Sequence, residues 1–219
     1  MQLVHKLLLY ASLIVSLATC KSDRDGNRCG VDRLPPSKIS EVALTSKGTI
    51  HVYRYNGFSE KITAAAIAEL KRYYPRVEEA GELEFPEWAK YKPKGCYTGS
   101  SILNQLRRTR KTDVVIGFTD KDVCYVNHGK EHYRCMGLGR AEQGVAIATT
   151  SRFKSKKNLQ LYFNRLVLHE LGHAFGLGHC INKDCIMVAA YGKNQFGHTP
   201  SFCRNCQEYL KAKNWRFNL

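Results

Sequence analysis

The chain has 219 residues, of which 43% are hydrophobic and 11% aromatic. This composition can bury a core and excludes a globally disordered chain, and the length suits one domain or two closely joined lobes. The formal net charge of +15 indicates a strongly basic surface, which in a cytosolic protein would suggest nucleic acid as a partner.

The N-terminus predicts the compartment. Lys6 precedes an apolar run over residues 7–17 and the small residues Ala18 and Thr19, which is the layout of a secretory signal. The run is shorter than the roughly 20 residues that a membrane-spanning helix needs. We expect export to a bacterial periplasm or cell envelope, or secretion. Export would separate the chain from nucleic acid and favours anionic lipid, acidic glycan or acidic peptide as partners of the basic surface.

Residues 17–20, Leu-Ala-Thr-Cys, resemble a lipobox, in which the cysteine is lipidated and becomes the mature N-terminus. Thr19 departs from the Gly, Ala or Ser usual at its position, and ordinary cleavage after Ala18 is the alternative. We expect residues 1–20 to form a signal peptide with Cys20 as a lipid anchor to the membrane. Residues 21–44 should be a polar tether, and residues 45–219 the folded domain.

The spacing of apolar residues predicts the elements of the folded part in chain order. We expect a strand at 49–55, a helix at 59–74, a strand at 77–85, a helix at 100–110, a strand at 113–119, a hairpin at 123–136, a strand at 144–150 and a long helix at 158–175. Pro75 and Gly176 predict the ends of the first and last helices. This order, followed by a cysteine-rich end, predicts an α+β fold with a mixed twisted sheet, one active-site helix and a small cysteine-rich C-terminal lobe.

The last predicted helix carries the chemistry. His169 and His173 are four residues apart, so their imidazoles share one face of the helix and can reach a single Zn²⁺. Glu170 lies about 100° further round, where it can accept a proton from a zinc-bound water. Gly176 lets the chain turn sharply, and the turn returns His179 as a third ligand. Three protein ligands leave one position open, as in a catalytic zinc site.

The full pattern is specific. A chance H-E-x-x-H in a chain of this composition has odds of roughly one or two per cent, whereas the added Gly176 and His179 lower the odds below roughly one in ten thousand. A satisfied core histidine is therefore a remote alternative for these positions.

The nine cysteines divide into groups. One group of four lies near the C-terminus: Cys180, Cys185, Cys203 and Cys206. Cys124 and Cys135 flank the predicted hairpin, so we expect them to form a disulfide, and elimination leaves Cys29 to pair with Cys96. Cys20 remains, and lipidation would account for it.

The string H-E-L-G-H-A-F-G-L-G-H-C, with C-I-M and C-R-N-C after it, resembles the archaemetzincins, a metzincin-type family of zinc metallopeptidases. The resemblance implies a catalytic zinc on the three histidines and a Met-turn in which Met187 lies beneath them without ligating. It also implies a second, structural zinc on the four C-terminal cysteines. In an oxidising compartment these cysteines could form disulfides instead, but the C-x-x-C half is the better clamp for zinc.

We therefore expect a monomeric zinc peptidase that hydrolyses peptide or protein substrates through a zinc-bound water with Glu170 as the general base. Aminopeptidase and endopeptidase action both fit. Residues 144–150 are the expected edge strand for an extended substrate, and Tyr191 is a candidate oxyanion donor that could equally be a packed surface residue. The alternatives are a non-catalytic, zinc-stabilised binding module, against which Glu170 argues, and a nucleic-acid-binding protein, against which export argues.

A basic run precedes the histidine-bearing helix at Arg152, Lys154, Lys156 and Lys157. The positive end of the helix dipole disfavours cations there, which suggests a functional cause. The run could favour acidic groups in the substrate or anionic membranes, and an ordinary solvated loop is the alternative.

Overall fold

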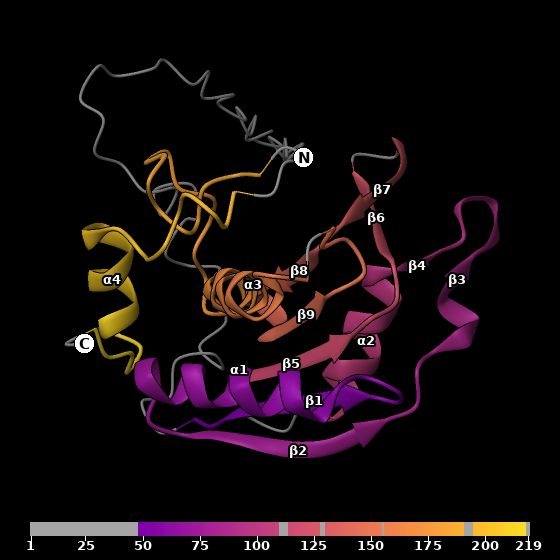
Figure 1. Cartoon of the computed structure of the whole chain (residues 1–219), viewed down its shortest axis with the longest axis horizontal. Coiled ribbons are helices and arrows are strands. Elements are labelled where there is room, and N and C mark those ends of the chain that lie inside the picture. The colour runs from indigo at the N-terminus through magenta and orange to yellow at the C-terminus, as the bar shows by residue number, and fades with distance from the viewer. Residues whose placement is uncertain (1–47, 110–113, 128–129, 155, 191–194, 218–219) are drawn as a thin grey trace, which may run out of the picture.

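The computed structural model describes residues 48–109, 114–127, 130–154, 156–190 and 195–217, which form two β-sheets and four α-helices (Figure 1). The expected signal peptide and tether, with Cys20 and Cys29, lie outside the described residues, as does Tyr191. Among the described helices, none is long and apolar enough to cross a membrane.

The larger sheet has five strands in the order β2-β1-β5-β9-β8. Its strands are β1 (Ile50–Tyr55), β2 (Val77–Leu83), β5 (Val114–Thr119), β8 (Gly137–Arg140) and β9 (Val145–Thr149). The first four strands of this order run parallel and β8 pairs antiparallel with β9, so the sheet is mixed, as predicted. The expectation that residues 144–150 form the substrate's edge strand is wrong. Both sides of β9 are paired and its residues are buried, and the edge is β8.

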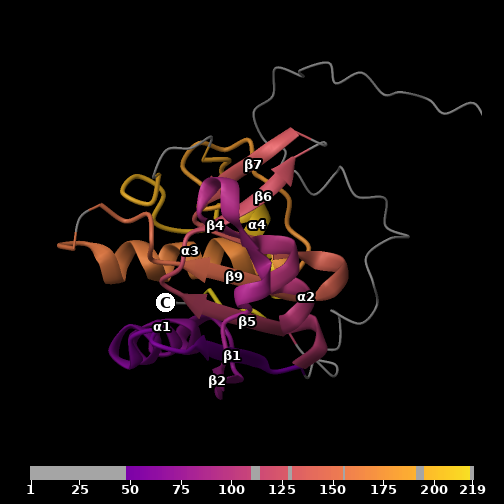
Figure 2. The ribbon, with the colours of Figure 1, turned by 90° about the vertical axis from the view of Figure 1, so that its right-hand side faces the viewer.

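Helices cover both faces of this sheet (Figure 2). On one face lie α1 (Glu60–Tyr73) and α3 (Leu159–Ala174), and on the other lies α2 (Gly99–Thr109). Successive strand residues point to opposite faces. In β5, Ile116 and Phe118 therefore join the core beneath α1 and α3, whereas Val115 joins the core beneath α2. The long helix that carries the histidines is thus fixed against the centre and edge of the sheet.

The smaller sheet has the order β3-β4-β6-β7. It contains β3 (Lys90–Tyr91), β4 (Cys96–Thr98), β6 (Val123–Asn127) and β7 (Lys130–Cys135). The 3₁₀ turns η4 (Glu87–Ala89) and η5 (Lys92–Lys94) flank β3, whereas η6 (Ala141–Gln143) connects β8 to β9 in the larger sheet. The predicted hairpin is confirmed by the antiparallel pairing of β6 with β7. It projects beyond the larger sheet (Figure 1).

The predicted disulfides are wrong, because Cys96 pairs with Cys124 at a Cα–Cα distance of 5.9 Å. In the hairpin Cys124 faces Arg134, while Cys135 faces Val123. This offset of one residue turns the Cys124 and Cys135 side chains to opposite faces. β4 runs parallel to β6 and brings Cys96 onto the Cys124 side. Cys135 is a free thiol, and Cys96 is not available to Cys29.

The C-terminal segment ends in α4 (Arg204–Lys211) and packs onto the main core. Trp215 is 3% exposed and its ring contacts Tyr74 and Phe175, at the ends of α1 and α3. The backbone N–H of Arg216 donates to the carbonyl of Tyr73 at 2.7 Å. These contacts fix the cysteine-rich segment beside the end of α3.

Candidate active site

α3 and the turn after it bring the three predicted histidines together. The Nε2 atoms of His169 and His173 lie 3.1 Å apart, and the rings of His173 and His179 have their centroids 4.8 Å apart. One ligand atom from each histidine lies within 4.8 Å of the others. The helix ends where predicted, because Gly176 adopts a φ of 107° and turns the chain back toward His179. A tetrahedral zinc with nitrogen ligands at about 2.0–2.1 Å would separate them by roughly 3.3 Å, so the group fits such an ion.

Backbone carbonyls orient two of the imidazoles. The Nδ1–H of His169 donates to the carbonyl of Ile186 at 2.6 Å, and that of His173 donates to the carbonyl of Leu177 at 2.7 Å. These bonds fix the tautomer that leaves the Nε2 lone pairs facing each other. Burial lowers the pKa of His169 to about 4 and also lowers the pKa of His173. Both rings are therefore neutral at pH 7, the form that binds a metal.

Glu170 lies beside the histidine group and is not part of it. Glu170 is 5% exposed, and this burial raises the pKa of its carboxyl to about 8. The carboxyl lies against β8, where a Cβ on Gly137 would come within 2.5 Å of Glu170 Oε1. A Cβ on Gly139 would come within 2.7 Å of the His173 Cβ. The glycines of β8 therefore allow the edge strand to lie directly along α3.

A cavity of about 1030 Å³ opens over this group. Its floor includes the three histidines and Glu170, and its walls include β8, the end of β7, the segment after β9 and the loop after Met187. Cys135 also lines it. A cavity of this size beside an exposed strand edge can hold an extended peptide segment.

Met187 lies beneath the histidines in a tight turn. The N–H of Val188 donates to the carbonyl of Cys185 at 3.0 Å, which closes the turn. Met187 is 0% exposed, and its Sδ lies against α3, where a Cβ on Gly172 would come within 2.5 Å of it. The N–H of Cys180 donates to the Met187 carbonyl at 2.8 Å, so this turn also ties the histidine segment to the first cysteine of the C-terminal group.

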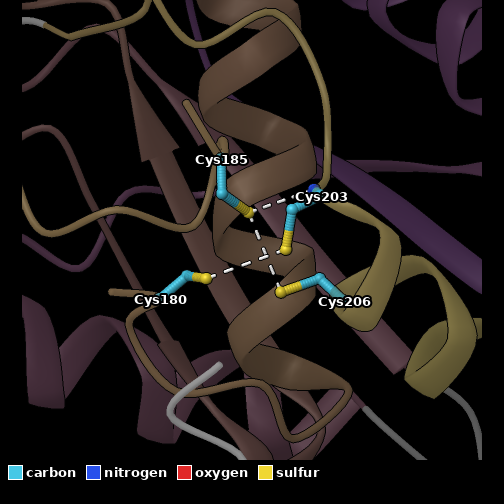
Figure 3. A group of neighbouring side chains, drawn as sticks. All are labelled: Cys180, Cys185, Cys203 and Cys206. Atoms are coloured by element: carbon cyan, nitrogen blue, oxygen red, sulfur yellow. Dashed lines mark hydrogen bonds between the residues drawn. The ribbon is translucent and has the colours of Figure 1, made fainter. Parts of the chain in front are cut away.

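The four C-terminal cysteines form a second candidate metal centre, and their side chains point toward one common point (Figure 3). Their sulfurs all lie within 4.8 Å of one another. The Sγ atoms of Cys180 and Cys203 are 3.8 Å apart, and those of Cys185 and Cys206 are 3.7 Å apart. A tetrahedral zinc with sulfurs at about 2.3 Å would separate them by roughly 3.8 Å, whereas a disulfide requires about 2.05 Å. The arrangement fits a metal and contains no disulfide.

The hydrogen bonds around Cys185 also favour its thiolate form. The pKa of Cys185 is lowered to about 5, chiefly by the hydrogen bond between its thiol and that of Cys206. The backbone N–H of Cys203, 3.3 Å from the Cys185 sulfur, contributes as well. A thiolate is the form that coordinates zinc. This second group is mostly buried, with three of its four cysteines buried and Cys203 of intermediate exposure.

Reasoning from the sequence missed β8, because the short segment Gly-Leu-Gly-Arg has little strand propensity. A signal was present: Gly137 and Gly139 alternate, as residues on one face of a strand do. It also missed Arg134, which lines the cavity from the end of β7. Nothing in the sequence next to Arg134 links it to the histidine motif.

A mixed sheet with a histidine-bearing helix and a third histidine after the helix defines a zincin-like metallopeptidase. Peptidase family M54 matches residues 94–212, and the chain belongs to this family. It is therefore a zinc-dependent peptidase, a hydrolase that acts on peptide or protein substrates.

Relatives and solved structures agree with this assignment. Archaemetzincin of Methanopyrus kandleri is 32% identical over 133 residues, which are 58% of this chain and 73% of that protein. Archaemetzincin of Nanoarchaeum equitans is 31% identical over 142 residues, which are 64% of this chain and 77% of that protein. The crystal structure of archaemetzincin from Methanopyrus kandleri has a TM-score of 0.64 at 24% identity, covering 77% of this chain and 96% of its own. The crystal structure of archaemetzincin from Archaeoglobus fulgidus, complexed with malonate, has a TM-score of 0.63 at 19% identity. It covers 74% of this chain and 99% of its own. The predicted archaemetzincin resemblance and zincin-like fold are confirmed.

Proposed function

We propose that His169, His173 and His179 hold the catalytic zinc and that Glu170 is the general base of peptide-bond hydrolysis. The observation that carries this proposal is the geometry of the buried carboxyl. Glu170 borders the histidine group on the cavity side and is not among its ligands. A purely structural zinc site has no need for a carboxyl in that place, which argues against a non-catalytic binding module.

When bound, the zinc would act as a Lewis acid on the scissile carbonyl and lower the pKa of its water. In its ionised form, the Glu170 carboxylate accepts a proton from the attacking water and passes it to the leaving amine. The carbonyl groups of Ile186 and Leu177 keep the imidazole rings in place during the reaction. Among the described strands β8 forms one edge of the larger sheet, and this edge binds the substrate backbone by strand addition, in the role first expected of residues 144–150.

The second part of the proposal is a structural zinc on the four cysteines, so that the protein carries two ions. The sulfur separations and the low pKa of Cys185 support it. Because all four positions of a Cys₄ site are filled by protein, this ion would stabilise the fold and take no part in the reaction. Met187 would serve as the Met-turn residue between the two centres.

We further propose that the peptidase works outside the cytoplasm, anchored through Cys20 or secreted. The disulfide between Cys96 and Cys124 supports this, because disulfides persist mainly in oxidising compartments. Processing at residues 1–20 remains a prediction that mass spectrometry of the mature N-terminus would test.

Glu170→Ala tests the mechanism. Loss of a general base typically lowers the rate by 10²–10⁴, while the three imidazoles still hold zinc. A peptide-library digest should show cleavage by the wild type and almost none by the variant, with equal zinc content in both. Cleavage by the variant at close to the wild-type rate would show that Glu170 is not the base.

A further inference from the structure

The cavity over the histidines has one strongly basic wall. Three cations line it: Arg134 at the end of β7, and Arg152 and Lys154 after β9. Among the described residues that line the cavity, Glu170 is the single carboxylate. A cation-rich wall within a partly enclosed cavity concentrates field lines and attracts anionic groups.

Asp122 holds two of these cations in place without neutralising them all. Arg134 forms an ion pair with Asp122 Oδ2 and also donates to the carbonyl of Lys94 at 2.5 Å. Arg152 Nη1 lies 3.6 Å from Asp122 Oδ1. The side chains of Arg134 and Arg152 are 44% and 40% exposed, so both remain reachable from solvent. Two guanidinium groups on one carboxylate, with Lys154 nearby in the same cavity, leave an excess of positive charge.

The basic wall lies at one end of β8. The N–H of Thr149 donates to the carbonyl of Met136 at 2.8 Å, which fixes the end of β9 beside the residue that precedes β8. A turn follows at once, closed by the N–H of Phe153 and the carbonyl of Thr150 at 3.2 Å. Arg152 therefore lies near Gly137 and not near Arg140, and Arg134 comes to the same end of β8 from β7.

The position of Glu170 gives the direction of the substrate. Its carboxyl lies against Gly137, whereas His173 lies against Gly139, further along β8. The base must reach the leaving amine, which begins the C-terminal part of the cleaved peptide. That part should therefore extend past Gly137, with the substrate antiparallel to β8, and meet the basic wall.

We propose that Arg134, Arg152 and Lys154 bind a carboxylate on the C-terminal side of the scissile bond, and that the peptidase prefers substrates that carry one. The carboxylate is either an acidic side chain or the free C-terminus of a short peptide. This inference rests on the proposed function, because it takes Glu170 as the group that meets the leaving amine.

The rest of the basic run supplies a matched control. Lys156 and Lys157 are exposed and lie in the same loop, and neither lines the cavity. Arg152→Gln with Lys154→Gln and Lys156→Gln with Lys157→Gln remove the same charge from the same segment. A difference between the two double variants therefore reports position in the cavity and not net charge.

The test compares quenched peptides that are identical except for Glu or Gln at the second residue after the cleaved bond. In a further pair the Glu or Gln stands before the bond, and a short neutral peptide is made with a free or an amidated C-terminus.

We expect Arg152→Gln with Lys154→Gln to lower the Glu-to-Gln ratio of kcat/KM about tenfold, mainly through KM. This effect should shrink as the salt concentration rises from about 50 to 500 mM. The control variant should keep the wild-type ratio. The dissociation constant of the Glu peptide on Glu170→Gln protein, with and without the cavity substitutions, gives a readout free of turnover.

An unchanged ratio, an equal change in the control variant, or a preference confined to the N-terminal side of the bond would each overturn the inference. Loss of binding to phosphatidylglycerol vesicles with the peptide ratio unchanged would assign the cluster to membranes and overturn it as well. A loss confined to the free-carboxyl peptide, with the Glu and Gln peptides alike, would identify the C-terminal carboxylate as the bound group. Failure of the proposed function is distinct, because neutral peptides would then be cleaved equally by wild type and Glu170→Ala, or not at all.

Discussion

The histidine and cysteine groups meet at consecutive positions of the chain but differ in what surrounds them. The histidine group opens onto a cavity, and its ligands are oriented by backbone carbonyls. The cysteine group sits between the turn after α3 and the start of α4, and its members belong largely to the hydrophobic core. Neighbouring positions His179 and Cys180 therefore serve opposite purposes. His179 lines the cavity, whereas Cys180 is buried in the core.

This contrast shows how a small domain can keep a reactive centre open. A catalytic metal site must leave one position open for water and substrate, so protein cannot close around the whole ion. Backbone hydrogen bonds connect the adjacent cysteine segment to the Met187 turn, and this turn packs against α3. We infer that the cysteine group supplies the rigidity that the histidine group needs.

The largest expected effect comes from breaking the closed site. Apparent zinc-binding energies in small Cys-rich sites are on the order of 10 kcal/mol, so Cys203→Ser should loosen the whole segment around α4. Fluorescence offers a specific readout, because Trp215, at 3% exposure, lies in this segment and Trp88, at 69%, does not. We expect a red-shifted emission and the loss of one zinc ion from the two counted by native mass spectrometry.

His179→Ala is the matched control for the open site. It should lose the catalytic ion and the activity while the emission of Trp215 stays unchanged, and a mild chelator should have the same reversible effect on the wild type. Native protein with a single zinc and two extra disulfides among the four cysteines would remove the basis of the comparison.

Removing the disulfide should give the next largest effect. The same experiment tests whether Cys96 and Cys124 are oxidised while the four C-terminal cysteines stay reduced. Cys96→Ala with Cys124→Ala should lower the free energy of unfolding by about 2–4 kcal/mol, because the bond closes a loop in the unfolded chain. Cys135→Ala should cost about 1 kcal/mol, as the loss of a small, partly buried thiol. Denaturant unfolding measures both values. Peptide mapping without reductant should recover Cys96 joined to Cys124 and the C-terminal four as thiols, and a bond between Cys124 and Cys135 would contradict the structure.

Much of the fold follows from local signals in the sequence. The first helix begins after Ser59, whose hydroxyl accepts from the N–H of Ile62 at 3.3 Å, and ends at Tyr73, before Pro75, as predicted. The helix of His169 ends just before Gly176, also as predicted. These boundaries depend on caps and breakers, which neighbouring residues specify. The histidine constellation was accessible for the same reason, since its spacing is set by one helix and one turn.

The errors concern pairings between distant segments. The hairpin was predicted correctly, but its register was not. An offset of one residue between the strands moves the Cys124 side chain to the face opposite Cys135. β9 lies inside the sheet because β8 pairs with its outer side. β8 was hard to predict because its glycines allow close contact with α3 but have low strand propensity. The basic wall likewise joins β7 to the segment after β9. Such proximity is a property of the topology, and no local pattern encodes it.

The smallest expected effect tests the link between the two regions. Tyr209 of α4 donates its hydroxyl to the carbonyl of Phe175, the C-cap residue of α3, at 3.3 Å. A helix end leaves its last carbonyls without intrahelical partners, so this bond satisfies one of them and joins the two helices. Tyr209→Phe keeps the ring and the contact with Lys213, whose Nζ lies 5.0 Å from the ring centroid. The variant should lose about 0.5–1.5 kcal/mol of unfolding free energy, the net value of one hydrogen bond, and retain both zinc ions.

Tyr133→Phe is the control, at a residue of β7 that is 50% exposed, and should change stability by less than about 0.5 kcal/mol. Chemical denaturation of the three proteins side by side measures the difference. Equal stability for all three would mean that α4 is held to α3 by apolar contacts and the cysteine group alone.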